Sequence, residues 1–198
     1  GRIAVSYGHH RMPASEAVVT GGMAKFLYLH EGYPHSPRCF NVLYLGSSSL
    51  PPDWRRQVIL AREKGARILW NQNGVAYPAW AGDSCERHNR PMREGAALAD
   101  HVIFQSEFCR ATFEEFVGPC PSSWEILHNP VDTSRFRPED PPNVGGRAVR
   151  ILHAGTIETI DRFESAVECV AELRQRSVEA HLAIAGRFAV NPSAFNGI

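Results

Sequence analysis

The sequence has no net charge and no long apolar run. Its 21 Lys and Arg residues balance its 21 Asp and Glu residues, so no overall electrostatic field attracts nucleic acid or an acidic partner. No apolar run approaches the about 20 residues that a membrane-spanning helix needs, and residues 1–7 lack the features of a signal peptide. These absences disfavour a nucleic-acid-binding protein and lead us to expect a cytoplasmic location.

The cysteines and histidines show no metal-binding pattern. The five cysteines are odd in number and widely spaced, and no two form a Cys-x-x-Cys pair, which predicts reduced thiols. His30 and His35 bound a stretch that looks like a zinc motif, but Gly32 and Pro34 disfavour the helix that would place both imidazoles on one face. We therefore expect no metal site.

The common phosphate-binding and hydrolase motifs are also missing. The chain contains no G-x-G-x-x-G fingerprint, no P-loop, no G-x-S-x-G elbow and no D-x-D pair. If the chain binds a nucleotide diphosphate, it must neutralise the charge with helix N-termini, backbone amides or basic side chains.

Short apolar runs alternate with amphipathic stretches, which predicts an α/β fold with a parallel sheet and flanking helices. We expect a helix within residues 16–29 that begins as late as Gly21, and a second helix that Asp53 caps. A third helix is expected over Met92–Ala99, and a fourth begins after the cap residue Ser106, with its Phe108 facing inward. Residues 71–89 lack a clear period, which predicts a long functional or mobile loop. The strands expected in this part of the chain are Arg2–Tyr7, Phe40–Leu45, Arg67–Trp70, His101–Gln105 and Trp124–Leu127.

Pro138–Gly146 is the clearest linker, with three prolines and two glycines. It is followed by a strand over Val149–His153, a helical stripe that begins at Phe163, and a strand over His181–Ala185. We therefore predict a Rossmann-like domain over residues 1–137, a linker over 138–146, and one βαβ unit of an incomplete second Rossmann-like domain over 147–198. A single βαβ unit cannot bury both its faces, so it must pack against something else.

Two short motifs are candidates for ligand binding. Gly21 and Gly22 at a helix start would let backbone amides approach a phosphate, although a tight helix start or close packing also explains them. Asn71-Gln72-Asn73-Gly74 directly follows a buried strand, where amides suit sugar hydroxyls, although an Asn-Gly turn with amide caps explains it equally well. The basic helix after Asp53 is expected to be a solvated face, with weak contact to an anionic membrane surface as the alternative.

Four motifs carry a resemblance to a known family. The motifs are Ala99–Phe108, Ile126–Asp132, Ile151–Thr156 and Leu182–Gly186. In this order and spacing the chain is similar to the retaining group-1 (family 4) nucleotide-sugar glycosyltransferases, which have the two-domain GT-B fold. The similarity covers about residues 65–187.

The resemblance implies specific roles for several residues. Gly21 and Gly22 would match the glycine-rich loop that faces the donor phosphates, and Gln72 and Asn73 would lie on the acceptor side. The family's basic pair, which clamps the diphosphate, is replaced by Thr156 and Asp161. Arg162 and Arg187 are the candidate substitutes as donor phosphate ligands. No catalytic residue is assigned, and the family's acidic motif would lie beyond residue 198.

The function expected from this resemblance is transfer of a sugar from a nucleotide diphosphate sugar to an acceptor hydroxyl, without metal or cofactor and with retention of configuration. The acceptor would be a sugar, a lipid-linked molecule or a small molecule. We expect the 198-residue chain alone to be inactive. The alternative is a non-catalytic Rossmann-like module that binds a sugar or a nucleotide. A nucleotide-dependent sugar epimerase fits less well, because its glycine fingerprint and Tyr-x-x-x-Lys pair are missing.

Overall fold

A computed structural model describes residues 1–14, 17, 19, 21–134, 136–138, 148–157 and 160–188. Contacts divide the chain into two compact units, Gly1–Val131 and Asp132–Ile198, and each is described by itself. The elements of the first unit are β1 (Val5–Ser6), α1 (Gly21–Gly32), β2 (Val42–Gly46), α2 (Trp54–Glu63), β3 (Arg67–Gln72), α3 (Pro78–Ala81), the 3-10 helix η1 (Gly82–Ser84), α4 (Cys85–Leu98), β4 (His101–Phe104), α5 (Glu107–Phe116) and β5 (Trp124–Ile126). Those of the second unit are β6 (Val149–Ile157), α6 (Ile160–Gln175) and β7 (Ala180–Phe188).

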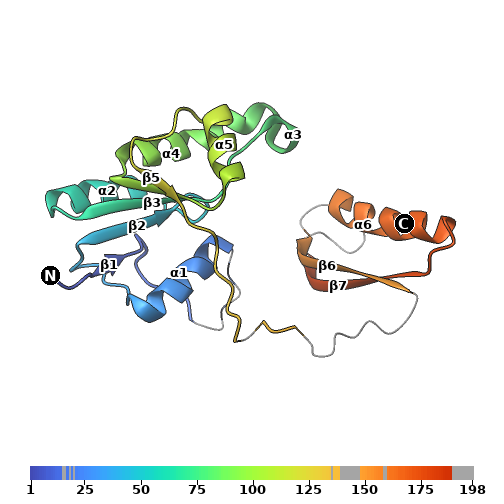
Figure 1. Ribbon diagram of the computed structural model, residues 1–198. Coiled ribbons are helices and arrows are strands. Elements are labelled where there is room, and N and C mark those ends of the chain that lie inside the picture. The colour runs from blue at the N-terminus through green and yellow to red at the C-terminus, as the bar shows by residue number, and fades with distance from the viewer. Residues whose placement is uncertain are drawn as a thin grey trace. The chain divides into compact units, whose positions relative to one another are not determined.

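The first unit is a five-stranded parallel sheet with helices on both faces, as in a Rossmann-like fold. The strands lie in the order β1-β2-β3-β4-β5, and every neighbouring pair is parallel. In Figure 1, α2, α4 and α5 cover one face of this sheet and α1 covers the opposite face. The α/β fold with a parallel sheet, expected from the sequence, is confirmed.

The larger core lies between the sheet and α2, α4 and α5. Trp54, Val58 and Ala61 form the buried stripe of α2 that their spacing predicts. Trp70 of β3 is fully buried, and α4 crosses it so closely that a Cβ on Gly95 would overlap the indole ring. Glycine at position 95 is therefore required by the helix–sheet distance and not by backbone conformation.

A smaller core lies between the sheet and α1. Phe26 of α1 stacks on Tyr7 with ring centroids 5.3 Å apart, and it meets Tyr44 of β2 edge to face at 5.8 Å. All three side chains are buried. This aromatic contact fixes the position of α1 on its face of the sheet.

The arrangement of helices opens a crevice at the carboxyl edge of the sheet. The chain leaves β1 toward α1 on one face, whereas it leaves β2, β3 and β4 toward helices on the other face (Figure 1). Connections that diverge in this way leave room above the strand ends, where open α/β sheets bind ligands.

The second unit contains a sheet of its own, in which β6 and β7 pair in parallel along their whole length. Val170 of α6 is buried, and Phe163, Ala166 and Val167 are half-buried on the same stripe. Gly155 and Gly186 are partners in register, and a Cβ on Gly186 would overlap the carbonyl of Gly155. Most of the predicted linker, residues 139–146, lies outside the described residues.

Several expected element boundaries were wrong. β1 contains only Val5 and Ser6 because the backbone on either side pairs with side chains: Ala4 N donates to Asn41 Oδ1 and Tyr7 N to His35 Nδ1. β6 and β7 extend beyond the strands expected at His153 and Ala185. Among the helices of the described residues, none is long and apolar enough to cross a membrane.

The expected long loop over residues 71–89 was also wrong. It contains α3, η1 and the first residues of α4, which begins at Cys85 and not at Met92. The sequence did not predict the first part of this helix because of Pro91, since proline inside a helix removes a hydrogen bond and normally marks the end of the helix.

The two expected helix caps differ in outcome. Ser106 caps α5 as expected, because its Oγ accepts from Cys109 N at 3.1 Å. Asp53 precedes α2 but makes no side-chain cap, since its carboxylate accepts from Gln57 Nε2 at 2.9 Å instead. Phe108 is 72% exposed and so does not face the core. The phenylalanine of this helix that is buried in the core is Phe113.

Candidate functional site

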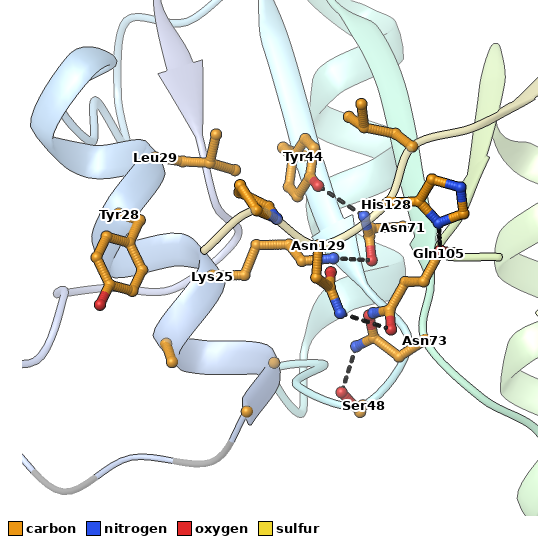
Figure 2. Close-up of a pocket in the computed structure, with 15 residues that line it drawn as sticks. Lys25, Tyr28, Leu29, Tyr44, Ser48, Asn71, Asn73, Gln105, His128 and Asn129 are labelled. Atoms are coloured by element: carbon orange, nitrogen blue, oxygen red, sulfur yellow. Dashed lines mark hydrogen bonds between the residues drawn. The ribbon is translucent and has the colours of Figure 1, made fainter. Parts of the chain in front are cut away.

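A pocket of about 800 Å³ lies in the first unit, between α1 and the carboxyl ends of the strands. Figure 2 shows side chains from α1 on one side of it and side chains from the strand ends on the other. The lining residues are Gly21, Gly22, Ala24, Lys25, Tyr28, Leu29, Tyr44, Ser48, Asn71, Asn73, Gln105, Leu127, His128, Asn129 and Pro130.

Three amide side chains in the pocket are joined head to tail. Asn129 Nδ2 donates to Gln105 Oε1 at 3.1 Å, Gln105 Nε2 donates to Asn73 Oδ1, and Asn73 Nδ2 donates to Ser48 Oγ. We call these four residues the amide chain (Figure 2). Each follows a different strand, from β2 at Ser48 to β5 at Asn129. The amide chain therefore runs across four strand ends, and each amide keeps a second N–H or lone pair for a ligand.

The backbone of Asn73 is fixed on both sides. Its N–H donates to Ser47 Oγ at 2.9 Å, and its carbonyl accepts from Cys109 Sγ at 3.0 Å. Ser47 is buried, and Cys109 lies in the first turn of α5. These contacts hold the middle of the amide chain in place before any ligand arrives, which reduces the entropy lost on binding.

A second polar group in the pocket contains the ammonium of Lys25. Lys25 Nζ donates to Asn71 Oδ1 at 3.1 Å, and Asn71 Nδ2 donates to Tyr44 OH at 2.8 Å (Figure 2). Burial lowers the pKa of Lys25, with an opposing effect from Cys109, and it raises the pKa of Tyr44 to about 12. Tyr44 therefore stays a neutral phenol, and Asn71 connects it to a partly desolvated lysine.

Gly21 and Gly22 line the pocket where α1 begins. A Cβ on Gly22 would clash with the hydroxyls of Ser48 and Ser49, whereas Gly21 has open space around its Cβ position. Close packing therefore accounts for Gly22, and the role of both glycines toward donor phosphates stays a prediction. Ser49 Oγ is buried and has no hydrogen-bond partner among the described residues.

Of the two residues expected on the acceptor side, only Asn73 lines the pocket. Gln72 is fully buried, where Oε1 accepts from Trp70 Nε1 and Nε2 donates to the carbonyl of Gly74. Successive side chains of a strand point to opposite faces, so Asn71 and Asn73 share one face and Gln72 lies on the other. The acceptor role of Gln72 is not supported by this placement.

The two candidate arginines belong to the second unit. The backbone of Arg162 lies in α6 and that of Arg187 in β7, while their side chains lie outside what the structure describes. The role of both arginines toward donor phosphates therefore stays a prediction.

The chemistry of the pocket is hydrogen bonding with one positive charge. None of the lining residues is Asp or Glu. Within the described part of the chain, no group of three or more His, Cys, Asp and Glu side chains could hold a metal ion. The pocket is equipped to bind and orient a ligand with several hydroxyl groups and an anionic group.

Sequence reasoning missed Lys25, Tyr44, Gln105 and Asn129 as lining residues. Gln105 and Asn129 could have been found, because Gln105 ends a predicted strand of a parallel sheet and Asn129 lies just after another. Lys25 gave no such signal, because its place depends on how α1 packs through Phe26.

Comparisons with known proteins add little to this description. No protein family and no curated protein matches the chain. A chain of the solved structure titled "Glycosylation Associate Protein (Gap123) complex from Streptococcus agalactiae" aligns with 83% of this chain at 8% sequence identity and a TM-score of 0.35. This chain spans 29% of the length of that chain. A likeness at this level carries no argument about fold or function.

Proposed function

We propose that this chain is the acceptor-side part of a glycosyltransferase that moves a sugar from a nucleotide diphosphate sugar to an acceptor hydroxyl. The first unit would bind the acceptor, and β6, α6 and β7 would begin the donor side. The observation that carries the proposal is the amide chain, because neutral amides fixed across four strand ends suit the hydroxyl groups of a carbohydrate.

The pocket would act by positioning. Fixing an acceptor hydroxyl in one orientation converts a bimolecular encounter into an effectively intramolecular step. The fixed backbone of Asn73 supports such a role, because a preorganised site loses little entropy when the ligand binds. The sheet formed by β6 and β7 alone supports a separate donor side, since a module with one continuous sheet would add these strands to the first sheet.

The test is binding of carbohydrates to the whole chain by isothermal titration calorimetry. The ligands are neutral hexoses and disaccharides, hexose phosphates, nucleoside diphosphates and nucleotide diphosphate hexoses. We expect sugar-bearing ligands to bind. Gln105→Ala should weaken this binding about tenfold, since one hydrogen bond is worth about 1 kcal/mol and the partly buried amide of Asn73 also loses its partner. Gln57→Ala, on α2 and outside the pocket, is the matched control and should bind the same ligands as tightly as the wild type does.

Failure of every carbohydrate to bind would contradict the proposal. Equal loss in the Gln105→Ala and Gln57→Ala variants would also contradict it, because the effect would then not come from the pocket.

A non-catalytic sugar-binding or nucleotide-binding module is the second candidate, and the lack of a carboxylate among the lining residues favours it. The double variant Arg162→Ala and Arg187→Ala separates the two. A transferase requires weaker binding of nucleotide diphosphate sugars in this variant, with unchanged binding of neutral sugars. A module that binds entirely through the first unit requires no change in either.

A further inference from the structure

Lys25 is the one Lys or Arg among the residues that line the pocket. No carboxylate accompanies it there, and its only hydrogen bond within the described residues is to the neutral Asn71. Lys25 and Lys64 are the only lysines among the 21 basic residues of the chain. Among the described residues that line the pocket, this partly desolvated positive charge thus has no carboxylate to balance it.

The position of Lys25 in α1 adds to this imbalance. It lies four residues after Gly21, where α1 begins, and the first turn of this 12-residue helix contains no acidic residue. The N-terminal end of a helix carries a partial positive charge that acts within its first turn, and Gly21 and Gly22 of that turn line the pocket. The helix end and the ammonium therefore both raise the electrostatic potential of the same pocket.

The contacts of Lys25 hold its ammonium in place. Asn71, which accepts from Nζ, is fully buried and is itself fixed by Tyr44 OH. Figure 2 shows the lysine side chain extending from α1 across the pocket toward the strand ends, where the amide chain lies. An ammonium has three N–H donors, and Asn71 takes one of them. A ligand held by the amide chain would meet the other two.

We propose that Lys25 binds a phosphoryl group of the ligand, so that the pocket takes a phosphorylated sugar in preference to a neutral one. This inference rests on the proposed function and names the substrate class of the same site. A lysine is a point charge that suits a tetrahedral anion, whereas arginine, which supplies nearly all other basic residues of this chain, suits planar bidentate recognition. The phosphoryl group belongs to a sugar phosphate or to a nucleoside diphosphate, and the test distinguishes the two.

The scarcity of lysine allows a direct test. Incorporation of 13Cε-labelled lysine leaves the ammonium groups unchanged and gives one Cε resonance each for Lys25 and Lys64, which Lys64→Arg assigns. The labelled whole chain is titrated with a hexose, its 6-phosphate, a hexuronate, a nucleoside diphosphate and orthophosphate. We expect the Lys25 resonance to shift with the hexose phosphate and the Lys64 resonance, at the exposed end of α2, to remain in place.

Affinity measured on unmodified protein gives the second readout. Lys25→Met should weaken binding of the hexose phosphate about 10- to 100-fold, since a charged hydrogen bond is being removed, and should weaken binding of the neutral hexose by a clearly smaller factor. Lys64→Met is the matched control and should bind both ligands as the wild type does.

Each other result overturns part of the proposal. A hexose that binds as tightly as its phosphate would overturn the inference and leave the proposed function standing, whereas binding of no sugar at all would remove both. A hexuronate that binds through Lys25 as tightly as the phosphate would replace phosphoryl by carboxylate recognition. A Lys25 shift with the nucleoside diphosphate alone would assign the phosphoryl group to the nucleotide. If orthophosphate binds as tightly as the hexose phosphate, the pocket recognises the phosphoryl group and not the sugar.

Discussion

Asn89 is a buried amide in the middle of α4 that joins three segments of the first unit. Its Oδ1 accepts from Ala76 N and its Nδ2 donates to the carbonyl of Ala76, both at 2.8 Å, and Nδ2 also donates to the carbonyl of Phe116 at 3.2 Å. The side chain thereby satisfies backbone groups of the segment between β3 and α3 that would otherwise be buried without partners.

Replacing Asn89 by Ala should lower the free energy of unfolding by about 2–4 kcal/mol, because two buried backbone groups of Ala76 lose their partners. Urea denaturation followed by tryptophan fluorescence measures the change. Asn41→Ala is the matched control, since Asn41 bonds to the backbone of Ala4 and Arg2 in a similar way but is exposed. Its loss should stay below about 1 kcal/mol, because water replaces the missing partner. Similar losses in the two variants would show that burial of Asn89 is not the cause.

The outer edge of β1 is completed by an imidazole. Tyr7 N donates to His35 Nδ1 at 3.2 Å, His35 Nε2 donates to the carbonyl of His9 at 2.8 Å, and Val5 pairs with His35 as an isolated parallel bridge. Only a neutral His35 can accept the hydrogen bond from Tyr7. Burial lowers the pKa of His35, with further lowering by His30 and His9 and an opposing effect from the hydrogen bond to His9.

We expect the first unit to lose stability as the pH falls below about 6.5, the ordinary pKa of histidine. Below that pH, His35 is protonated in the unfolded chain but still neutral in the folded chain. The free energy of unfolding therefore falls with pH until the pH reaches the lowered pKa of His35 in the folded state. His9, whose pKa burial also lowers, adds to the same trend. Urea denaturation between pH 8 and pH 5 measures the slope.

The variant His35→Asn separates the contribution of His35 from the rest. An asparagine oxygen can accept from Tyr7 N but does not titrate, so the stability of this variant should depend less steeply on pH. Asn41→Ala, which removes an exposed side chain that does not titrate, should keep the slope of the wild type. If the stability of His35→Asn depends on pH as steeply as that of the wild type, His35 is not the cause of the pH dependence.

The elements that the sequence predicted well are those with an unambiguous pattern. Val42–Leu45 is continuously apolar because β2 is buried on both faces, and the stripe of Trp54, Val58 and Ala61 has only one face to bury. The start of α4 could not be predicted, because residues 85–90 are almost entirely polar and Pro91 follows them. Asn89 shows what anchors this first part of the helix: hydrogen bonds to the backbone of Ala76 and Phe116 and not an apolar period.

The candidate site was predicted only where sequence position alone determines it. Asn73 follows β3, so its place at the carboxyl edge required nothing more than the strand itself. Side chains alternate between the two faces of a strand, so Gln72 lies on the opposite face from Asn71. This alternation could have been used to leave Gln72 out of the predicted site. Lys25 could not be predicted, because only the packing of Phe26 on Tyr7 and Tyr44 brings α1 to the pocket.

At the scale of the whole molecule, the first unit contains everything that its own sheet and pocket require. All five paired strands, both hydrophobic cores and every lining residue of the pocket lie within Gly1–Val131. All four tryptophans of the chain, at positions 54, 70, 80 and 124, lie there as well. Tryptophan fluorescence therefore reports unfolding of the first unit, whereas far-ultraviolet circular dichroism also includes α6 and the strands of the second unit.

A chain that ends at Val131 should unfold in urea with the same fluorescence midpoint as the whole chain, because no strand of the first sheet pairs with β6 or β7. The variant Asn89→Ala should lower this midpoint by the same amount in both chain lengths, since the two changes share no contact partner among the described residues. A lower midpoint in the short chain would show that the second unit stabilises the first. An effect of Asn89→Ala that depends on chain length would show that the two units unfold as one cooperative structure.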